Sequence, residues 1–110
     1  MEHPSTHQPV VAYVARGGTA KLAHLRKRPQ SNVTFRAGGS WLAVEGAAEL
    51  AGPDDPASWL HAGGLPQLLR DVFTAAGGTH DNWPEYDRVM AAERRCAVFV
   101  TIERLYGVVR

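Results

Sequence analysis

Apolar residues alternate with polar ones, or gather in β-branched runs, along several segments of the chain. Segment 10–14 is rich in valine and predicts a first strand. Alternation over 32–36 predicts a second strand whose buried face carries Val33 and Phe35. After the turn at Gly38-Gly39-Ser40, alternation over 41–50 completes an antiparallel β-hairpin.

Within the second hairpin strand, Gly46 predicts a bulge or a close approach of another backbone. Residues 97–101 and 105–109 are strongly β-forming and predict two closing strands. A short break at Glu103-Arg104 separates them. Together these patterns predict five strands.

Two longer helices are predicted between the hairpin and the closing strands. From Leu65, apolar residues at i+3, i+4, i+7, i+8 and i+11 form one stripe, which ends at Gly77-Gly78. Asp81 or Asn82 caps the next helix, which ends near Arg94-Arg95, where basic side chains suit the negative end of the helix dipole.

The order of elements is a strand, a short helix, a hairpin, two helices and two strands, which is not the regular alternation of a doubly wound sheet. We therefore predict a single domain over residues 1–110, mainly antiparallel β with inserted helices (α+β), its sheet curled into a barrel. Residues 1–8 carry few side chains that could pack, and we expect them to be flexible.

The number of cysteines and the length of the apolar runs exclude several classes of protein. Cys96 is the only cysteine, so no intrachain disulfide and no cysteine-based zinc site can form. The histidines show no metal-ligand spacing, and no metal site is expected. No signal peptide opens the chain and no apolar run approaches the roughly 18 residues of a membrane span, so we expect a cytoplasmic protein without membrane contact.

Charge is distributed unevenly although the net charge is only +1. Six basic residues and no acidic one lie between Arg16 and Arg36, whereas residues 45–110 carry ten acidic and six basic residues. This concentration of positive charge indicates an anionic ligand. A solvated basic helix face is the alternative.

A short helix is predicted over 20–27, begun by Thr19 as N-cap and ended by Pro29. Leu22 and Leu25 share the face expected to point inward.

The start of this helix is the best candidate for binding chemistry. Gly17-Gly18-Thr19 leads into Ala20, so free backbone N–H groups and the helix dipole favour an anion there. Lys21 lies in the first turn, Arg16 just before it, and His24 one turn later, near the same face. The arrangement is a candidate phosphate cradle, although the same residues also suit an ordinary turn and cap.

Other candidate chemistry is sparse. Trp41 opens its strand on the face opposite Leu42 and Val44, where it could cover a planar ligand or pack against protein. Cys96 heads an apolar strand and is expected to be a buried small hydrophobe. Glu45 and Glu49 share one face of a strand but form no obvious catalytic pair, and no catalytic residue is named.

Four segments, in this order, carry a resemblance to one family. Residues 18–29 read Gly-Thr-Ala-Lys-Leu-Ala-His-Leu-Arg-Lys-Arg-Pro, and residues 41–50 read Trp-Leu-Ala-Val-Glu-Gly-Ala-Ala-Glu-Leu. Residues 80–86 read His-Asp-Asn-Trp-Pro-Glu-Tyr, followed by Met90 and Arg94-Arg95, and residues 103–107 read Glu-Arg-Leu-Tyr-Gly. Over about residues 10 to 108, this resembles the deazaflavin-dependent branch of the pyridoxamine 5′-phosphate oxidase-like superfamily.

The resemblance implies an FMN-binding-like split β-barrel that forms a homodimer with cofactor sites at the subunit interface. It implies coenzyme F420, or in some relatives FMN or haem, and hydride transfer between the cofactor and a small molecule. The family's phosphate-binding lysine corresponds to Lys21. A position that is commonly basic corresponds to Thr19, where Arg16 could offset the lost charge, and a common asparagine corresponds to His24.

The cofactor-binding residues expected on these grounds are Arg16, Thr19, Ala20, Lys21, His24 and Trp41. Family members usually carry a helix and about two strands before the equivalent of Val10, whereas Met1 lies only nine residues before it. We therefore expect either that the chain is a trimmed variant without those N-terminal strands, or that its start is assigned too late.

Three functions compete. The first is an F420- or FMN-dependent oxidoreductase. The second is a non-catalytic module of the same fold that holds a cofactor, haem or another tetrapyrrole. The third, nucleic-acid binding through segment 26–28 and Arg36, requires exposed aromatic residues beside the basic ones; only Trp41 and Phe35 are near, and no nucleic acid is expected.

Overall fold

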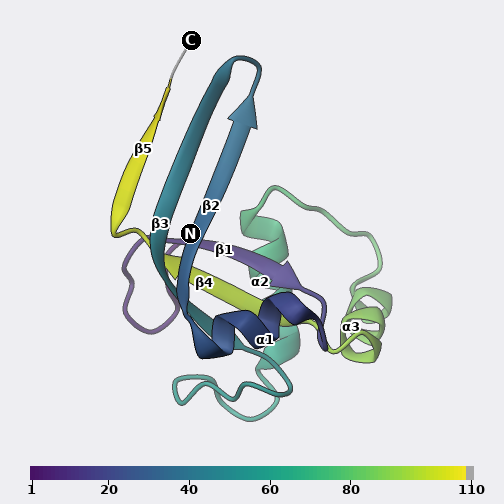
Figure 1. The fold of residues 1–110 in the computed structure, drawn as a ribbon. Helices are drawn as coiled ribbons and strands as arrows, with labels where there is room; N and C mark the ends of the chain where they lie inside the picture. The colour runs from purple at the N-terminus through teal and green to yellow at the C-terminus, as the bar shows by residue number, and fades with distance from the viewer. Residues whose placement is uncertain (109–110) are drawn as a thin grey trace.

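One antiparallel β-sheet forms the centre of the molecule, and helices lie on both of its faces (Figure 1). The computed structural model describes residues 1–108. Its strands are β1 (Val10–Ala15), β2 (Gln30–Ala37), β3 (Ser40–Ala51), β4 (Cys96–Thr101) and β5 (Arg104–Val108). Its helices are α1 (Ala20–Lys27), α2 (Leu65–Ala75) and α3 (Trp83–Ala92). The strand order is β1-β4-β3-β2, and β5 also pairs with β3.

Strand β3 organises the sheet because it is twelve residues long and pairs with three other strands. Residues 40–47 pair with β2 on one side. On the other side, residues 41–45 pair with β5 and residues 48–51 pair with β4. Strands β4 and β5 therefore follow the same edge of β3, one after the other.

Gly46 lies where β3 passes from β5 to β4. A Cβ atom at this position would lie 1.6 Å from the carbonyl oxygen of Thr101, so no larger residue fits without moving the backbone. The N–H of Glu103 donates to the carbonyl of Glu45, 2.9 Å away, and carries the chain across the break. The close approach predicted at Gly46 is thus confirmed.

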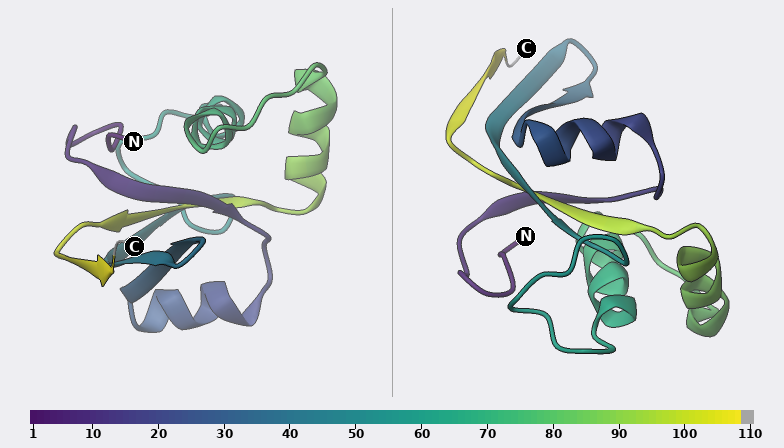
Figure 2. Two further views of the ribbon diagram at one scale, coloured as in Figure 1. Left: turned by 90° about the horizontal axis from the view of Figure 1, so that it is seen from above. Right: turned by 60° about the horizontal axis from the view of Figure 1, so that its bottom comes forward.

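The inner face of the curled sheet packs against α1 (Figure 2). Leu22 and Leu25 of this helix are buried against Val98 and Val100 of β4, as their spacing predicts. Thr19 caps the helix, and the backbone leaves the helical conformation at Arg28, before Pro29.

The outer face packs against α2 and α3, which Figure 2 shows on the side of the sheet opposite α1. Leu68, Leu69 and Val72 of α2 cover Phe99 of β4, and Tyr86 of α3 joins the same cluster. Asn82 caps α3 by accepting from the N–H of Glu85. Both helices are those predicted from the apolar stripe and the cap.

Some predicted ends differ from the structure. Helix α3 ends at Ala92, so Arg94 and Arg95 lie beyond it and form ion pairs with Asp54 and Glu93. Strand β5 begins at Arg104, and Val109 lies outside the described residues. These arginines were predicted to lie in the last turn and to interact with the helix dipole, but they lie after that turn and pair with carboxylates instead.

The segment before β1 packs through one residue that the sequence analysis overlooked. His3 is 6% exposed and lies edge-on to the rings of Trp59 and Phe99. Its Nε2 lies 2.5 Å from Oε1 of Glu49. The N–H of Val10 also donates to the carbonyl of Met1, which closes the segment into a turn against the sheet.

The far half of the hairpin differs from prediction in its burial. Val33 and Phe35 were expected to lie on a buried face, but Phe35 is 48% exposed and Leu42, its cross-strand partner, is 41% exposed. The reason is that α1 covers only the half of the inner face that lies near β4. The rest of this apolar face is open.

The fold is a mostly antiparallel sheet curled into a half-barrel with three helices among the described residues, compatible with the α+β class. Over residues 1–108, none of the helices has the length and apolar character needed to cross a membrane.

Candidate ligand-binding groove

The start of α1 is fixed by two backbone contacts. The Gly17 N–H donates to the carbonyl of Glu93, 3.1 Å away, and a Cβ atom on Gly17 would lie only 2.3 Å from the carbonyl oxygen of Arg94. Gly18 follows with φ +71°, which glycine adopts without strain. The local sequence thus folds into a tight turn that delivers the chain to Thr19.

The Thr19 hydroxyl caps the helix and also bonds to the turn before it. The hydroxyl donates to the carbonyl of Arg16 at 3.2 Å and accepts from the N–H of Leu22 at 3.4 Å. α-Helical geometry leaves the N–H groups of Ala20 and Lys21 without an intrahelical acceptor. No acidic residue lies in the first turn, so the helix dipole there is uncompensated.

Ion pairing divides the basic residues into two sets. After position 40, each described arginine pairs with a carboxylate; these residues are Arg70, Arg88, Arg94, Arg95 and Arg104. Before it, Arg26 forms a bidentate pair with Asp55. Within residues 1–108, the other five basic residues of segment 16–36 form no ion pair; they are Arg16, Lys21, Lys27, Arg28 and Arg36. Positive charge around α1 is therefore uncompensated by the described protein.

Lys21 lies at the wall of a cavity of about 460 Å³, here called the lysine groove. Its Nζ atom is 4.5 Å from the centroid of the Tyr13 ring, a cation–π contact. The residues that line the groove are Val11, Ala12, Tyr13, Lys21, Ser31, Asn32, Val33, Thr34, Phe35 and Ala76. Five of them are consecutive in β2, so the groove follows the edge of that strand.

The edge of β2 that faces the groove has no strand partner among residues 1–108. Alternate N–H groups along such an edge are free to donate to a ligand. The lysine groove thus combines one ammonium group, backbone donors and the apolar side chains of Val11, Val33 and Phe35. This combination suits a ligand with an anionic part and a flat apolar part.

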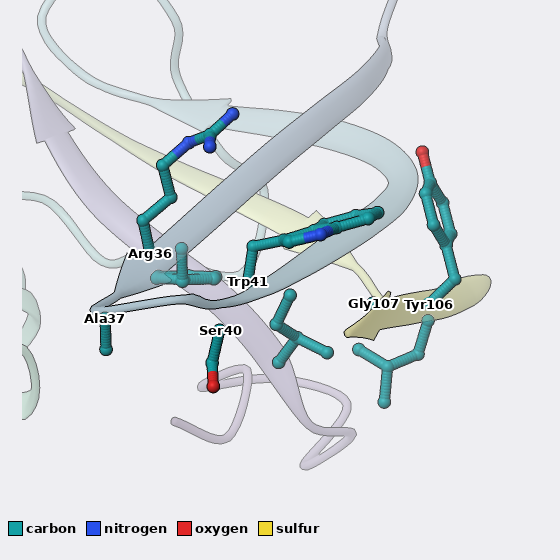
Figure 3. Close-up of a pocket in the computed structure, with 9 residues that line it drawn as sticks. Arg36, Ala37, Ser40, Trp41, Tyr106 and Gly107 are labelled. Atoms are coloured by element: carbon teal, nitrogen blue, oxygen red, sulfur yellow. The ribbon is translucent and has the colours of Figure 1, made fainter. Parts of the chain in front are cut away.

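Trp41 does not join Lys21. Trp41 pairs with Arg36 across the hairpin, and side chains that pair across strands share one face of a sheet. Figure 3 shows Arg36, Trp41 and Tyr106 on one side of the three strands, with Ala37 and Ser40 on the other. Lys21 belongs to α1, which packs on that other, inner face. The structure therefore places Trp41 on the outer face, edge-on to Tyr106.

The remaining candidates surround the helix start. Arg16 and His24 are exposed, and neither lines the lysine groove. The carbonyl of His24 accepts the C-capping N–H of Arg28. Of the six residues expected to hold a cofactor, the structure thus gathers five on α1 and the turn before it, and it places Lys21 alone against the groove.

Two residues central to the groove were not among the expected site residues. Tyr13 holds the lysine side chain, and Phe35 lines the groove as well as the adjoining cavity. The sequence signal that could have identified Tyr13 is its position two residues after Val11 on β1, which places both side chains on the inner face.

Cys96 is excluded as a nucleophile. Its side chain is buried beside Gly52, and its thiol donates to the carbonyl of Ala97. Burial raises the pKa of this thiol to about 11. The thiolate, which is the reactive form, is thus scarce at neutral pH, as expected for a packed hydrophobe.

No group of three or more metal-ligating side chains occurs among residues 1–108. A scan of the sequence against models of known protein families matches none of them. The arguments for a ligand therefore come from the groove itself.

Proposed function

We propose that the chain binds a phosphorylated deazaflavin or flavin, coenzyme F420 or FMN, in the lysine groove and acts as an oxidoreductase. The observation that carries the proposal is the position of Lys21, a cation without a carboxylate partner among residues 1–108, against a groove that is otherwise largely apolar. A phosphate satisfies the ammonium and the free N–H groups of the helix start. A tricyclic ring suits the apolar wall.

The resemblance to the deazaflavin-dependent branch supports the same reading, because the position expected to bind phosphate is Lys21. A split β-barrel is part of the proposal, and the antiparallel half-barrel is compatible with it. In such a protein the cofactor supplies the redox chemistry, and the chain binds it, orients it and excludes water. No acid–base side chain is assigned.

A homodimer and a cytoplasmic location complete the proposal. Dimerisation would extend the limited core of a 110-residue chain. A single buried thiol suits a reducing compartment. Light scattering of the purified protein tests the dimer.

A non-catalytic module that holds the same cofactor, or haem, is the second candidate. The position of Lys21 against a largely apolar groove supports it as well, because that observation bears on binding and not on turnover. It predicts cofactor binding without turnover of any acceptor.

The test is a fluorescence titration with F420 and with FMN on the wild type, Lys21→Ala and Lys27→Ala. Lys27 is the matched control, because it is also exposed on α1 and unpaired within residues 1–108 but does not line the groove. Lys21→Ala should bind the cofactor about 5- to 150-fold more weakly than the wild type, because it loses a charged hydrogen bond. Lys27→Ala should stay within about threefold of wild type, since its charge contributes only weakly at a distance. Equal effects of the two substitutions, or no binding to either cofactor, would refute the proposal.

A further inference from the structure

A second cavity, of about 450 Å³, lies on the inner face of the hairpin beyond the lysine groove. Its floor is formed by Phe35, Leu42 and Leu105, here called the apolar shelf, which are 48%, 41% and 58% exposed. Strand pairing sets Phe35 beside Leu42, so both side chains point to the same face. Gly107 pairs with Leu42 on the other side and adds no side chain, which keeps this part of the floor low.

The shelf is continuous with the lysine groove. Phe35 lines both cavities, and Val44 is buried between its strand partners Val33, which lines the groove, and Leu105, which forms part of the shelf. A ligand held in the groove would therefore adjoin whatever occupies the shelf.

The side chains that form the shelf provide no charge. Arg36, the charged residue among those that line this cavity, has its side chain on the outer face (Figure 3). Ser40 contributes a hydroxyl at the rim. An ionic or strongly polar molecule would lose its hydration here without gaining a charged partner, whereas an uncharged apolar one gains about 25 cal/mol for each Å² that is buried.

The shelf is too small to form a dimer interface by itself. Three side chains exposed to about half of their surface offer on the order of 300 Å², against about 800 Å² for each partner of a standard interface. The cavity volume, in contrast, falls within the roughly 300–1,000 Å³ of small-molecule sites. The limited area and this volume thus favour a small molecule over a second copy.

We propose that the apolar shelf is the substrate subsite of this protein and that it selects uncharged, flat, apolar molecules. The inference rests on the proposed function, because the cofactor would lie beside it in the lysine groove. Binding at the shelf itself needs no cofactor, and it can be measured alone.

The test uses N-phenyl-1-naphthylamine, an uncharged dye with a naphthalene and a phenyl ring that fluoresces in apolar surroundings, with cofactor-free protein. Saturable binding to the wild type is expected. Leu42→Gln and Leu105→Gln should weaken it at least tenfold. Ile102→Gln is the matched control, because Ile102 is 42% exposed but does not line the cavity, and it should leave binding unchanged.

Lys21→Ala should also leave dye binding unchanged, since the dye carries no charge. The wild type separates the two proposals: if it binds the dye but neither F420 nor FMN, the cofactor proposal is refuted and the shelf is kept. Circular dichroism checks that each variant is folded. The proposal is overturned if the wild type shows no saturable dye binding, or if the Leu42 and Leu105 variants bind as well as the Ile102 variant. A third result also overturns it: light scattering shows a dimer, the dimer does not bind the dye, and Leu105→Gln dissociates the dimer. The shelf then belongs to an interface between copies.

Discussion

The Nζ atom of Lys21 lies 4.5 Å from the ring centroid of Tyr13, and this contact holds a cation against the lysine groove without neutralising it. A carboxylate in the place of the ring would cancel the charge that a phosphate needs. An aromatic face attracts the ammonium by about 0.5–1 kcal/mol at an exposed site and leaves its charge available.

Tyr13 should therefore act as a positioning residue. Tyr13→Leu removes the ring and should weaken FMN or F420 binding about two- to fivefold, the equivalent of one exposed cation–π contact. Tyr13→Phe keeps the ring and should bind as the wild type does. Fluorescence titration measures both variants, and equal losses in the two would show that the hydroxyl, not the ring, is what matters.

His3 should be the residue that anchors the N-terminal segment. Its Nδ1 accepts the N–H groups of Ser5 and Thr6, so the ring proton is on Nε2 and is donated to Glu49. Removing a buried, fully hydrogen-bonded ring should lower the free energy of unfolding by about 2–4 kcal/mol in His3→Ala.

The matched control is His7→Asn in the same turn. His7 is exposed and has φ 61°, a conformation that asparagine tolerates. Urea unfolding should find it within about 0.5 kcal/mol of wild type. A His3→Ala variant as stable as His7→Asn would contradict the anchoring role.

Gly46 should tolerate no side chain. The methyl group of Gly46→Ala would meet the Thr101 carbonyl, which belongs to a paired strand, so the sheet must shift. We expect a loss of more than about 3 kcal/mol in the free energy of unfolding, or failure to fold. Gly63→Asn, in open space but at φ +81°, should lower stability by about 1 kcal/mol or less, because asparagine adopts the left-handed region more readily than most residues. Similar thermal midpoints for the two variants would disprove the close approach.

The thiol of Cys96 should contribute a specific dependence of stability on pH. Its folded pKa, about 11, lies above the value of about 8.5 for an unfolded cysteine. The stability that the folded state gains from keeping this thiol protonated is therefore fully present below about pH 8.5 and is lost as the pH rises toward 11. The urea midpoint of the wild type should fall over this window more steeply than that of Cys96→Ala. Ellman's reagent at pH 8 should react only with the unfolded wild-type protein, and rapid reaction of the native thiol would oppose this view.

Local signals in the sequence predicted most of the secondary structure. Thr19 and Asn82 satisfy helix N–H groups only a few residues away, and the stripe from Leu65 needs nothing but helical spacing. Gly46 was predictable because a glycine inside a strand has few other uses. The caps and the stripe depend on neighbours along the chain, and Gly46 is recognised by its residue type although its partner Thr101 is distant in sequence.

Features that depend on distant partners could not be predicted. His3 is buried because it packs against Trp59 and Phe99 and donates a hydrogen bond to Glu49, 46 residues away. Phe35 is exposed because no described element covers its part of the inner face, which strand alternation alone does not reveal. Trp41 and Lys21 were grouped into one site, but they lie on opposite faces once α1 packs on the inner one.

The most direct test of the lysine groove is nuclear magnetic resonance of the labelled protein during titration with F420 or FMN. If the cofactor binds as proposed, the largest amide shifts should fall on Ala20, Lys21 and the β2 residues that line the groove, such as Val33. Shifts concentrated on Trp41 and Tyr106 of the outer face, or no shifts at all, would contradict the proposed site.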